Sequence, residues 1–410
     1  MGIEFYSPKH RFDGIMYRIE SFTFRFIKFS LIFGVLLYDF IGITFGFKYI
    51  DEILLLVLLI YSFSNTSYSK EFKLFWGIFA FYLVYSLIYG VACNKAIFTD
   101  AIIFLKPFVG FYAAIQLGMQ MDDIQKQNVK RLVVVISVGM LTFSIIAYNY
   151  VMFSFMGHPS RFATLFQILG IIYFYCSDRS KKELLKTIII FGCSILSLRS
   201  KSYAFVGASI FLFYFMDAKK LERIRLSTIL SVLICIGIVF LVAWEKFQFY
   251  FITGSSDDMT ESFARPALYQ GAFVILKDYF PFGPGLGSYA NFASAEYYSP
   301  LYYKYGLNNV FGLAEGEGSF IADTFFPQLA QFGIVGVILF FMFFRKRFKE
   351  TMYYYSINCD PLIMKMSLII LIFFMIESSV DSTFVHNRGM IMMILWGMII
   401  NESKYKDLIE

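Results

Sequence analysis

Cationic side chains interrupt the apolar pattern of this sequence at four separate short connections, in the runs HPSR, LRSKS, SFARP and HNR. The residues are Arg161, Arg199 with Lys201, Arg265 and Arg388. A guanidinium presents planar, paired N–H donors that match phosphate oxygens, so a fold that gathers these side chains would suit a diphosphate. Any one of them could instead extend to lipid headgroups or cap a helix end. Four such connections together favour one anion site.

A carboxylate or an imidazole beside such a site could remove the proton from an attacking sugar hydroxyl. The candidates are Glu317 in the run AEGEGS, Asp323 just before an apolar run, and His386 in HNR. We favour Asp323 because the pattern predicts that it starts a helix next to the membrane. His158 in HPSR is a rival base, and a solvated surface position is the alternative for the two acids.

Three further acids, Asp39, Glu377 and Asp381, lie within apolar runs. A charge at bilayer depth is costly, so such residues are usually paired or functional. We expect them toward the outer ends of their helices, where they would pair with the arginines. An ion path is the alternative.

A glycine-rich run, PFGPGLGSYAN at 281–291, superficially resembles a phosphate-binding loop. It follows no βαβ pattern and is expected outside the cytoplasm, so it is a weak nucleotide fingerprint. A tight turn, or a place where the backbone approaches a ligand closely, is the better interpretation.

The composition shows which elements must position these groups. The chain has 410 residues, of which 58% are hydrophobic and only 16% charged, with a mean hydropathy of +0.63. A soluble domain is about 45–50% apolar, so this chain is expected to be all-α and embedded in a membrane. The net charge of +6 is spread over short loops, which argues against nucleic acid. The three histidines have no metal-ligand spacing, and we expect neither a metal nor a cofactor.

About twelve apolar runs are long enough, alone or with their flanks, to be membrane spans. They lie at 26–46, 50–63, 72–91, 99–118, 132–152, 162–176, 187–198, 203–216, 226–244, 323–344, 362–382 and 388–401. The predicted organisation is a tail at 1–25, nine spans within 26–244, a long outer loop at 245–322, three spans within 323–401 and a tail at 402–410. The runs at 50–63, 187–198 and 203–216 are short for a full crossing.

Orientation follows from the lysines and arginines, which are enriched in short cytoplasmic loops. Placing both termini in the cytoplasm puts most of the 36 on the inner side, at every inner loop. The cations at 161, 199, 201, 265 and 388 then fall on the outer side, against the rule. The N-terminal tail has no short apolar run with a cleavage site, so we expect no removable signal peptide.

Four segments, in order, resemble the O-antigen polymerase and ligase superfamily of bacterial envelope proteins, the Wzy and WaaL type. They are HPSRFATLFQILG (158–170), LSLRSKSYAFVGASI (196–210), ARPALYQGAFVILKDYFPFGPGLGSYANF (264–292) and DTFFPQLAQFGIVGVILFF (323–341). The resemblance covers roughly the C-terminal two thirds of the chain. The third and fourth segments in tandem are the most specific.

This resemblance implies a metal-independent GT-C-type glycosyltransferase in the bacterial inner membrane, with its active site facing the periplasm. Such enzymes transfer a glycan from an undecaprenyl diphosphate donor to a hydroxyl of a lipid-linked acceptor, and a chain-length regulator and a flippase are expected partners. Arg161, Arg199 and Arg265 fall where the family places arginines that hold the donor or its diphosphate. Ligases carry a His-Asn pair where this chain has Ala322-Asp323, which favours a polymerase in which Asp323 replaces the histidine.

Other classes remain as alternatives. A lipid-linked oligosaccharide flippase also has about twelve spans and internal cations, but its loops are short, whereas the outer loop here has nearly eighty residues. A ligase or an exopolysaccharide polymerase would differ in the acceptor rather than in the chemistry. A scaffold of a synthesis complex would leave the outer arginines unexplained.

Overall fold

The computed structural model describes residues 25, 27–38, 40–41, 50–64, 69–178, 180–215, 248, 262–318, 320–358 and 361–407. Every regular element in these ranges is a helix. In chain order they are η1 (Ser30–Leu36), α3 (Ile50–Ser64), α4 (Lys70–Tyr89), α5 (Asn94–Gln116), α6 (Asp123–Ile146), η2 (Tyr150–Phe155), α7 (Pro159–Tyr175), α8 (Lys181–Cys193), η3 (Ser194–Ser197), α9 (Ser200–Phe215), α12 (Ala264–Asp278), α13 (Phe292–Glu296), α14 (Pro300–Lys304), η6 (Leu307–Asn309), η7 (Phe326–Phe332), α15 (Gly333–Asn358), α16 (Pro361–Val380), η8 (Thr383–Val385) and α17 (Asn387–Asp407).

Four of the described helical segments are long and apolar enough to cross a membrane, judged by length and composition. They are Lys70–Tyr89, Asn94–Gln116, Asp123–Ile146 and Phe326–Tyr354. The all-helical, membrane-type prediction agrees with them, whereas the number of twelve spans and the orientation stay predictions. The predicted span at 226–244 lies outside the described residues.

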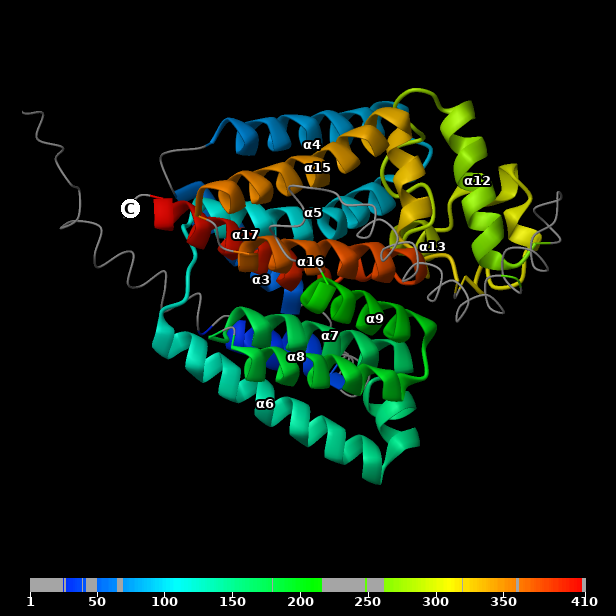
Figure 1. Cartoon of the computed structure of the whole chain (residues 1–410). Helices are drawn as coiled ribbons and strands as arrows, with labels where there is room; N and C mark the ends of the chain where they lie inside the picture. Colours follow the sequence, from blue (N-terminus) through cyan, green and yellow to red (C-terminus); the bar gives the residue numbers. More distant parts are fainter. Residues whose placement is uncertain are drawn as a thin grey trace, which may run out of the picture.

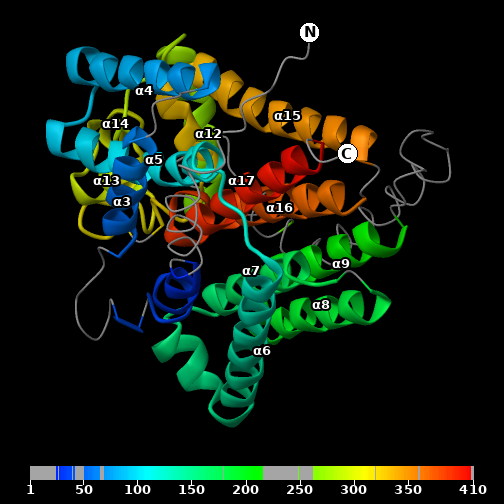
Figure 2. The ribbon, with the colours of Figure 1, turned by 90° about the vertical axis from the view of Figure 1, so that its left-hand side faces the viewer.

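The long helices form two groups (Figures 1 and 2). In one group α4, α5, α15, α16 and α17 run side by side, and α17 packs along the length of α5. In the other, α7 packs against both α6 and α8, and α9 contacts α16 of the first group. Helices α12 and α13 lie at the end of the bundle opposite the C-terminus.

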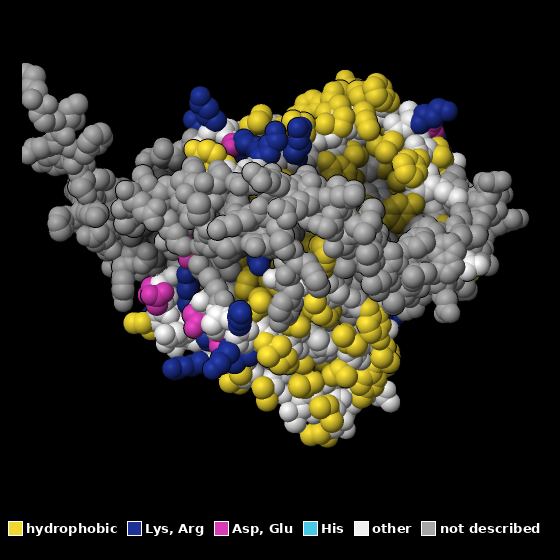
Figure 3. Space-filling model, in the orientation of Figure 1, with side chains coloured by type: hydrophobic (Ala, Val, Ile, Leu, Met, Phe, Trp, Pro, Cys, Tyr) yellow, Lys and Arg dark blue, Asp and Glu magenta, His cyan; other side chains and the backbone are white. Residues whose placement is uncertain are grey.

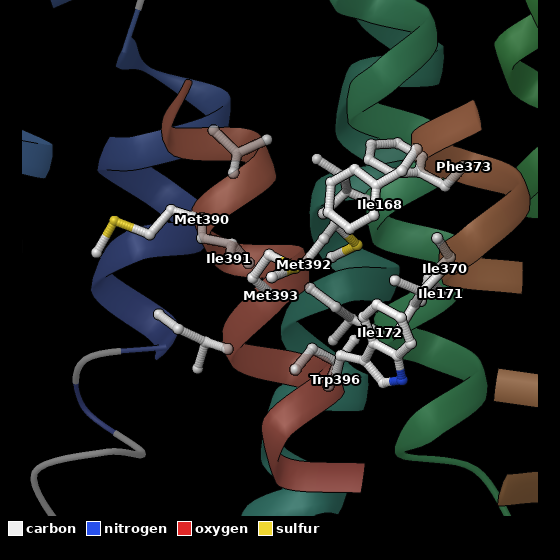
Figure 4. Packing of buried hydrophobic residues seen from close by; sticks show 14 of the residues in the cluster. Ile168, Ile171, Ile172, Ile370, Phe373, Met390, Ile391, Met392, Met393 and Trp396 are labelled. Carbon is white, nitrogen blue, oxygen red and sulfur yellow. The ribbon is translucent and has the colours of Figure 1, made fainter. Parts of the chain in front are cut away.

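The interior between the two groups is apolar and closely packed. Figure 4 shows Ile168 and Ile172 of α7 facing Met392 and Trp396 of α17, with Phe373 of α16 alongside. These side chains belong to one large cluster of buried hydrophobic residues. The indole N–H of Trp396 is satisfied by the Ser367 hydroxyl at 3.1 Å, so this large side chain is buried without an unmet donor.

The outer surface of several helices is also apolar, as expected where a helix faces lipid rather than water. Leu74 and Ile88 of α4 are each 64% exposed, and Ile146 of α6 is 78% exposed. Figure 3 shows hydrophobic side chains gathered over α4 and α15 at the top of the view and near the end of α6 at the bottom.

Ion pairs at the C-terminal end of the bundle join residues from the connections predicted to be cytoplasmic. They are Lys126–Glu402 (2.8 Å), Lys130–Glu183 (3.0 Å), Lys186–Glu183 (2.7 Å) and Arg347–Glu71 (2.5 Å). The first turns of α4, α6 and α8 therefore lie at the same end of the bundle as the last turns of α17. This is the arrangement expected of a bundle whose helices run up and down in turn.

The described part of the predicted outer loop is folded around its own buried cluster. This cluster includes Leu268 and Ile275 of α12, with Tyr289, Tyr302 and Leu313 from the segments that follow. Tyr289 donates to the Leu268 carbonyl at 2.8 Å. The Tyr302 hydroxyl accepts from the Ala290 amide at 2.9 Å and shares a hydrogen bond with the Ser294 hydroxyl at 2.8 Å. Residues Ala264–Asp278 of this predicted loop form the helix α12.

One ion pair with a buried lysine was not foreseen. Lys106, in the middle of α5 and only 6% exposed at its side chain, lies with its Nζ 2.5 Å from the Glu52 carboxylate of α3. Removing one member of such a pair leaves an uncompensated charge in a low-dielectric interior.

Lys106→Met is expected to destabilise the protein, by less than the ~3–5 kcal/mol typical of a fully buried pair, because the Glu52 side chain that loses Lys106 is 32% exposed. The measurement is thermal unfolding in detergent. The double variant Lys106→Met/Glu52→Gln should recover most of the loss, because it removes both charges. Lys95→Met, at an exposed position in the first turn of the same helix, is the control and should change little. A melting temperature unaltered by Lys106→Met would contradict a stabilising role for the pair.

Candidate functional site

The four cation-bearing connections meet at the end of the bundle that carries α12. We call this group of residues the outer cluster. It consists of His158, Arg161, Arg199, Lys201, Arg265, Asp323, Glu377, Asp381, His386 and Arg388. The structure thus brings together all five cations that the sequence singled out.

Helix starts position these cations. Arg161 is the third residue of α7, and Lys201, Arg265 and Arg388 are each the second residue of α9, α12 and α17. His158 caps α7 and Pro159 follows at its first position, a sequence that favours a helix start. A cation at a helix N-terminus opposes the helix dipole, at a cost of about 0.3–1 kcal/mol each. Four of them at one place form an arrangement that would suit an anion.

The most deeply buried contact of the outer cluster is an ion pair between a carboxylate and a lysine. Glu377 of α16 has no exposed surface, and its Oε2 lies 2.6 Å from Lys201 Nζ. The same oxygen accepts hydrogen bonds from Thr164 at 2.9 Å and Thr383 at 3.2 Å. Asp381 Oδ2 also lies 3.5 Å from Lys201 Nζ. Lys201, itself only 6% exposed, is therefore held by two carboxylates.

Arg265 is held by Asp323 and by the end of α16. Its Nε donates to Asp323 Oδ2 at 2.9 Å, its Nη2 also contacts this oxygen, and Nη2 donates to the Val380 carbonyl at 3.3 Å. Tyr269 of α12 and the Phe325 amide donate to the next carbonyls, those of Ser379 and Ser378. The outer segment thus satisfies the carbonyls that α16 leaves without intrahelical partners.

Asp323 lies in a bend before η7, and the regular α-helix α15 begins only at Gly333. The prediction that Asp323 starts a helix is therefore wrong, because η7 intervenes with 3-10 geometry. Its side chain is about one third exposed, at 32%. Burial raises the pKa of Asp323 above its ordinary value, although the charge of Arg265 opposes this effect.

Arg199 contacts His158, another member of the outer cluster. Its Nη2 lies 3.1 Å from His158 Nε2, while the Ser160 amide donates to His158 Nδ1 at 3.1 Å. A neutral imidazole accepts at only one nitrogen, so a single tautomer satisfies one of these contacts. Burial, followed by the charges of Arg199 and Arg161, lowers the pKa of His158. This shift favours the neutral imidazole, which is the form that can accept a proton.

The turn before α9 directs Arg199 and Lys201. Leu198 has φ 53°, in the left-handed region that is strained for a leucine, and it joins η3 to α9. Arg161 donates to the Met156 carbonyl at 3.4 Å, and Arg388 is 6% exposed at the start of α17. Both guanidiniums act electrostatically on Asp381, as do Lys201 and His386.

Glu317 is the predicted site residue that the structure places elsewhere. It is exposed in a turn between η6 and η7, and no hydrogen bond or ion pair among the described residues joins it to the outer cluster. Its neighbour Glu315 contacts the Tyr303 hydroxyl instead. His386 is exposed at the start of α17. Asp39, expected to pair with the arginines, lies outside the described residues.

The glycine-rich run is a tightly packed turn. The Gly287 amide donates to Asp100 of α5 at 2.9 Å and to Gln331 of η7 at 3.0 Å, and the Leu286 amide donates to Ser86 at 2.8 Å. Gly287 has φ 72°, and a Cβ there would lie 2.7 Å from the Ala96 backbone. Its amides therefore bind protein groups, and the tight-turn interpretation describes it better than a phosphate loop.

No metal-binding arrangement stands out in the described ranges: they contain no group of three or more His, Cys, Asp or Glu side chains that could hold an ion.

The chain matches no family model, and no curated protein matches it either.

Proposed function

We propose that this chain is a membrane glycosyltransferase that polymerises undecaprenyl-diphosphate-linked oligosaccharide repeat units into O-antigen or a related surface polysaccharide. The observation that carries the proposal is the outer cluster, in which five cations from four separate connections and four helix N-termini meet beside the folded outer segment. Such a concentration of charge-assisted donors suits a diphosphate.

The reaction that this arrangement favours is a displacement at the anomeric carbon of the donor. The acceptor hydroxyl oxygen forms a bond to that carbon, the bond from carbon to the diphosphate oxygen breaks, and the electron pair leaves with the diphosphate. The guanidiniums of Arg161, Arg199 and Arg265 would stabilise the negative charge that develops there. The hydroxyl proton passes to a base.

Asp323 is the base that the contacts favour. It lies in the outer cluster with a raised pKa, which strengthens a carboxylate as a proton acceptor. Glu317 is exposed and has no contact with the outer cluster among the described residues, and His386 is exposed, so both are weaker candidates. His158, with its lowered pKa, is the rival.

The first test is deletion of the gene in its host, followed by separation of the surface glycans by size on a gel. A polymerase predicts that long chains disappear while single repeat units remain on the lipid anchor. Undecaprenyl-linked polymer that never reaches its acceptor would indicate a ligase, and lipid-linked units confined to the cytoplasmic leaflet would indicate a flippase. An unchanged glycan profile would contradict all three.

A further inference from the structure

Glu377 is the point at which the helices that carry the cations are tied together. Its carboxylate contacts Lys201 of α9, Thr164 of α7 and Thr383 of η8, which directly precedes α17. Thr164 is one turn beyond Arg161, and Arg388 follows Thr383 by five residues. One fully buried side chain therefore links three of the four cation-bearing connections to α16.

Without negative charges nearby, the cations of the outer cluster would repel one another. Like charges a few ångströms apart in a medium of reduced dielectric disfavour one another strongly. Glu377 and Asp381 place two negative charges beside Lys201, and Asp381 also interacts with Arg161 and Arg388. These two carboxylates are positioned to hold the cations together before any anion arrives.

We infer that Glu377 is the positioning residue of this site, and that its charge limits how tightly the site retains a diphosphate product. The inference rests on the proposed function, because it takes the outer cluster to be the diphosphate site. Glu377 acts through its contact with Lys201 and through the helices that it joins, rather than by touching the substrate. A site with the same cations and no such carboxylate would bind the departing polyprenyl diphosphate more tightly and release it more slowly.

The geometry offers a substitution that removes the charge and keeps the contacts. The contacts of Glu377 with Lys201, Thr164 and Thr383 are all made by Oε2, and within the described residues Oε1 has no hydrogen-bond partner. In Glu377→Gln the amide oxygen can take the place of Oε2 and the NH₂ group the place of Oε1. Asp381→Asn is the second variant, at a side chain that is 22% exposed and so easier to change without unfolding.

A matched control lies at the other end of the bundle. Glu183 is also buried and ion-paired, to Lys130 and Lys186, and it accepts a hydrogen bond from Tyr173 at 2.6 Å. Glu183→Gln removes a comparable buried charge far from the outer cluster. The double variant Lys201→Met/Glu377→Gln removes a positive and a negative charge together, and so restores the net charge of the site.

The experiment is isothermal titration calorimetry, in which inorganic pyrophosphate is added to the purified full-length protein in detergent. Glu377→Gln is expected to bind pyrophosphate about tenfold more tightly than the wild type, the size of effect that one nearby charge produces. Asp381→Asn should tighten binding less, the double variant should return toward the wild-type affinity, and Glu183→Gln should leave it unchanged. Turnover by Glu377→Gln should fall through slower product release.

Two results separate this inference from the proposed function. If the wild type binds pyrophosphate and Arg161→Ala weakens that binding, but Glu377→Gln binds equally or more weakly, Glu377 is a structural residue only and the inference fails alone. If the wild type binds no pyrophosphate, the outer cluster is not a diphosphate site and both fail. Should Glu377→Gln not accumulate, the same comparison is decided by Asp381→Asn and by the double variant.

Discussion

Replacing Arg161, Arg199 or Arg265 by alanine, one at a time, should abolish long-chain glycan while the protein still inserts and accumulates. Each guanidinium would donate charge-assisted hydrogen bonds to a diphosphate whose negative charge grows as the glycosidic bond breaks. Removing one such donor typically costs about 10²–10³-fold in rate. The measurement is the size distribution of surface glycan in cells carrying each variant, with the protein quantified in the membrane fraction.

A cation on the same helix as Arg265 provides the control. Lys277 is exposed in the last turn of α12, distant from the helix start that carries Arg265, and Lys277→Ala should leave the glycan unchanged. Polymer of normal length in all three arginine variants would remove the basis for the proposed function.

Arg265 needs a second variant because it has two roles. Besides its proposed contact with the diphosphate, Arg265 binds Asp323 and the Val380 carbonyl, so its loss also disturbs the contact between α12 and the end of α16. Arg265→Lys keeps the positive charge but loses the planar pair of donors. We expect it to accumulate normally and to retain only part of the activity, which would separate recognition of the diphosphate from folding.

The gathering of the outer cluster was accessible from sequence because it depends on a simple rule. The charge pattern assigns the connections at 161, 199, 265 and 388 to one side, and in a serpentine helical bundle all connections on one side lie at one end. The helix starts were accessible too, since His158-Pro159 is a local signal. The chemical roles of these residues stay predictions.

The pairings were not accessible, because they depend on which side chains meet across helices that are distant in sequence. The acids were expected to pair with arginines, but Glu377 pairs with Lys201, which is 176 residues away. The Lys106–Glu52 pair and the carbonyls of α16 that Arg265 and Tyr269 cap have no local signature. Hydropathy also carries no signal for the 3-10 segment η7, which separates Asp323 from its helix.

Asp323→Asn should reduce polymerisation by about 10²–10⁴-fold, the contribution typical of a general base. The side chain keeps its shape and can still accept a hydrogen bond from Arg265, so the protein should accumulate. The measurement is turnover of a lipid-linked repeat unit by purified protein in detergent. Glu317→Gln is the matched control, because it removes a carboxylate that is exposed and makes no contact with the outer cluster in the described residues. Its activity should be within about twofold of the wild type, since surface substitutions have small effects.

The pH dependence of activity also tests whether Asp323 is the general base, through the direction in which the acid limb of the profile moves. A general base acts in its deprotonated form, so activity should fall as the pH drops through the pKa of Asp323. Burial raises that pKa, which means that activity is lost at a higher pH than an ordinary aspartate would require. Because the charge of Arg265 lowers this pKa, Arg265→Ala should move the acid limb of its residual activity to still higher pH. If Asp323→Asn keeps both the acid limb and the rate, Asp323 only positions Arg265, and the base is to be sought at His158.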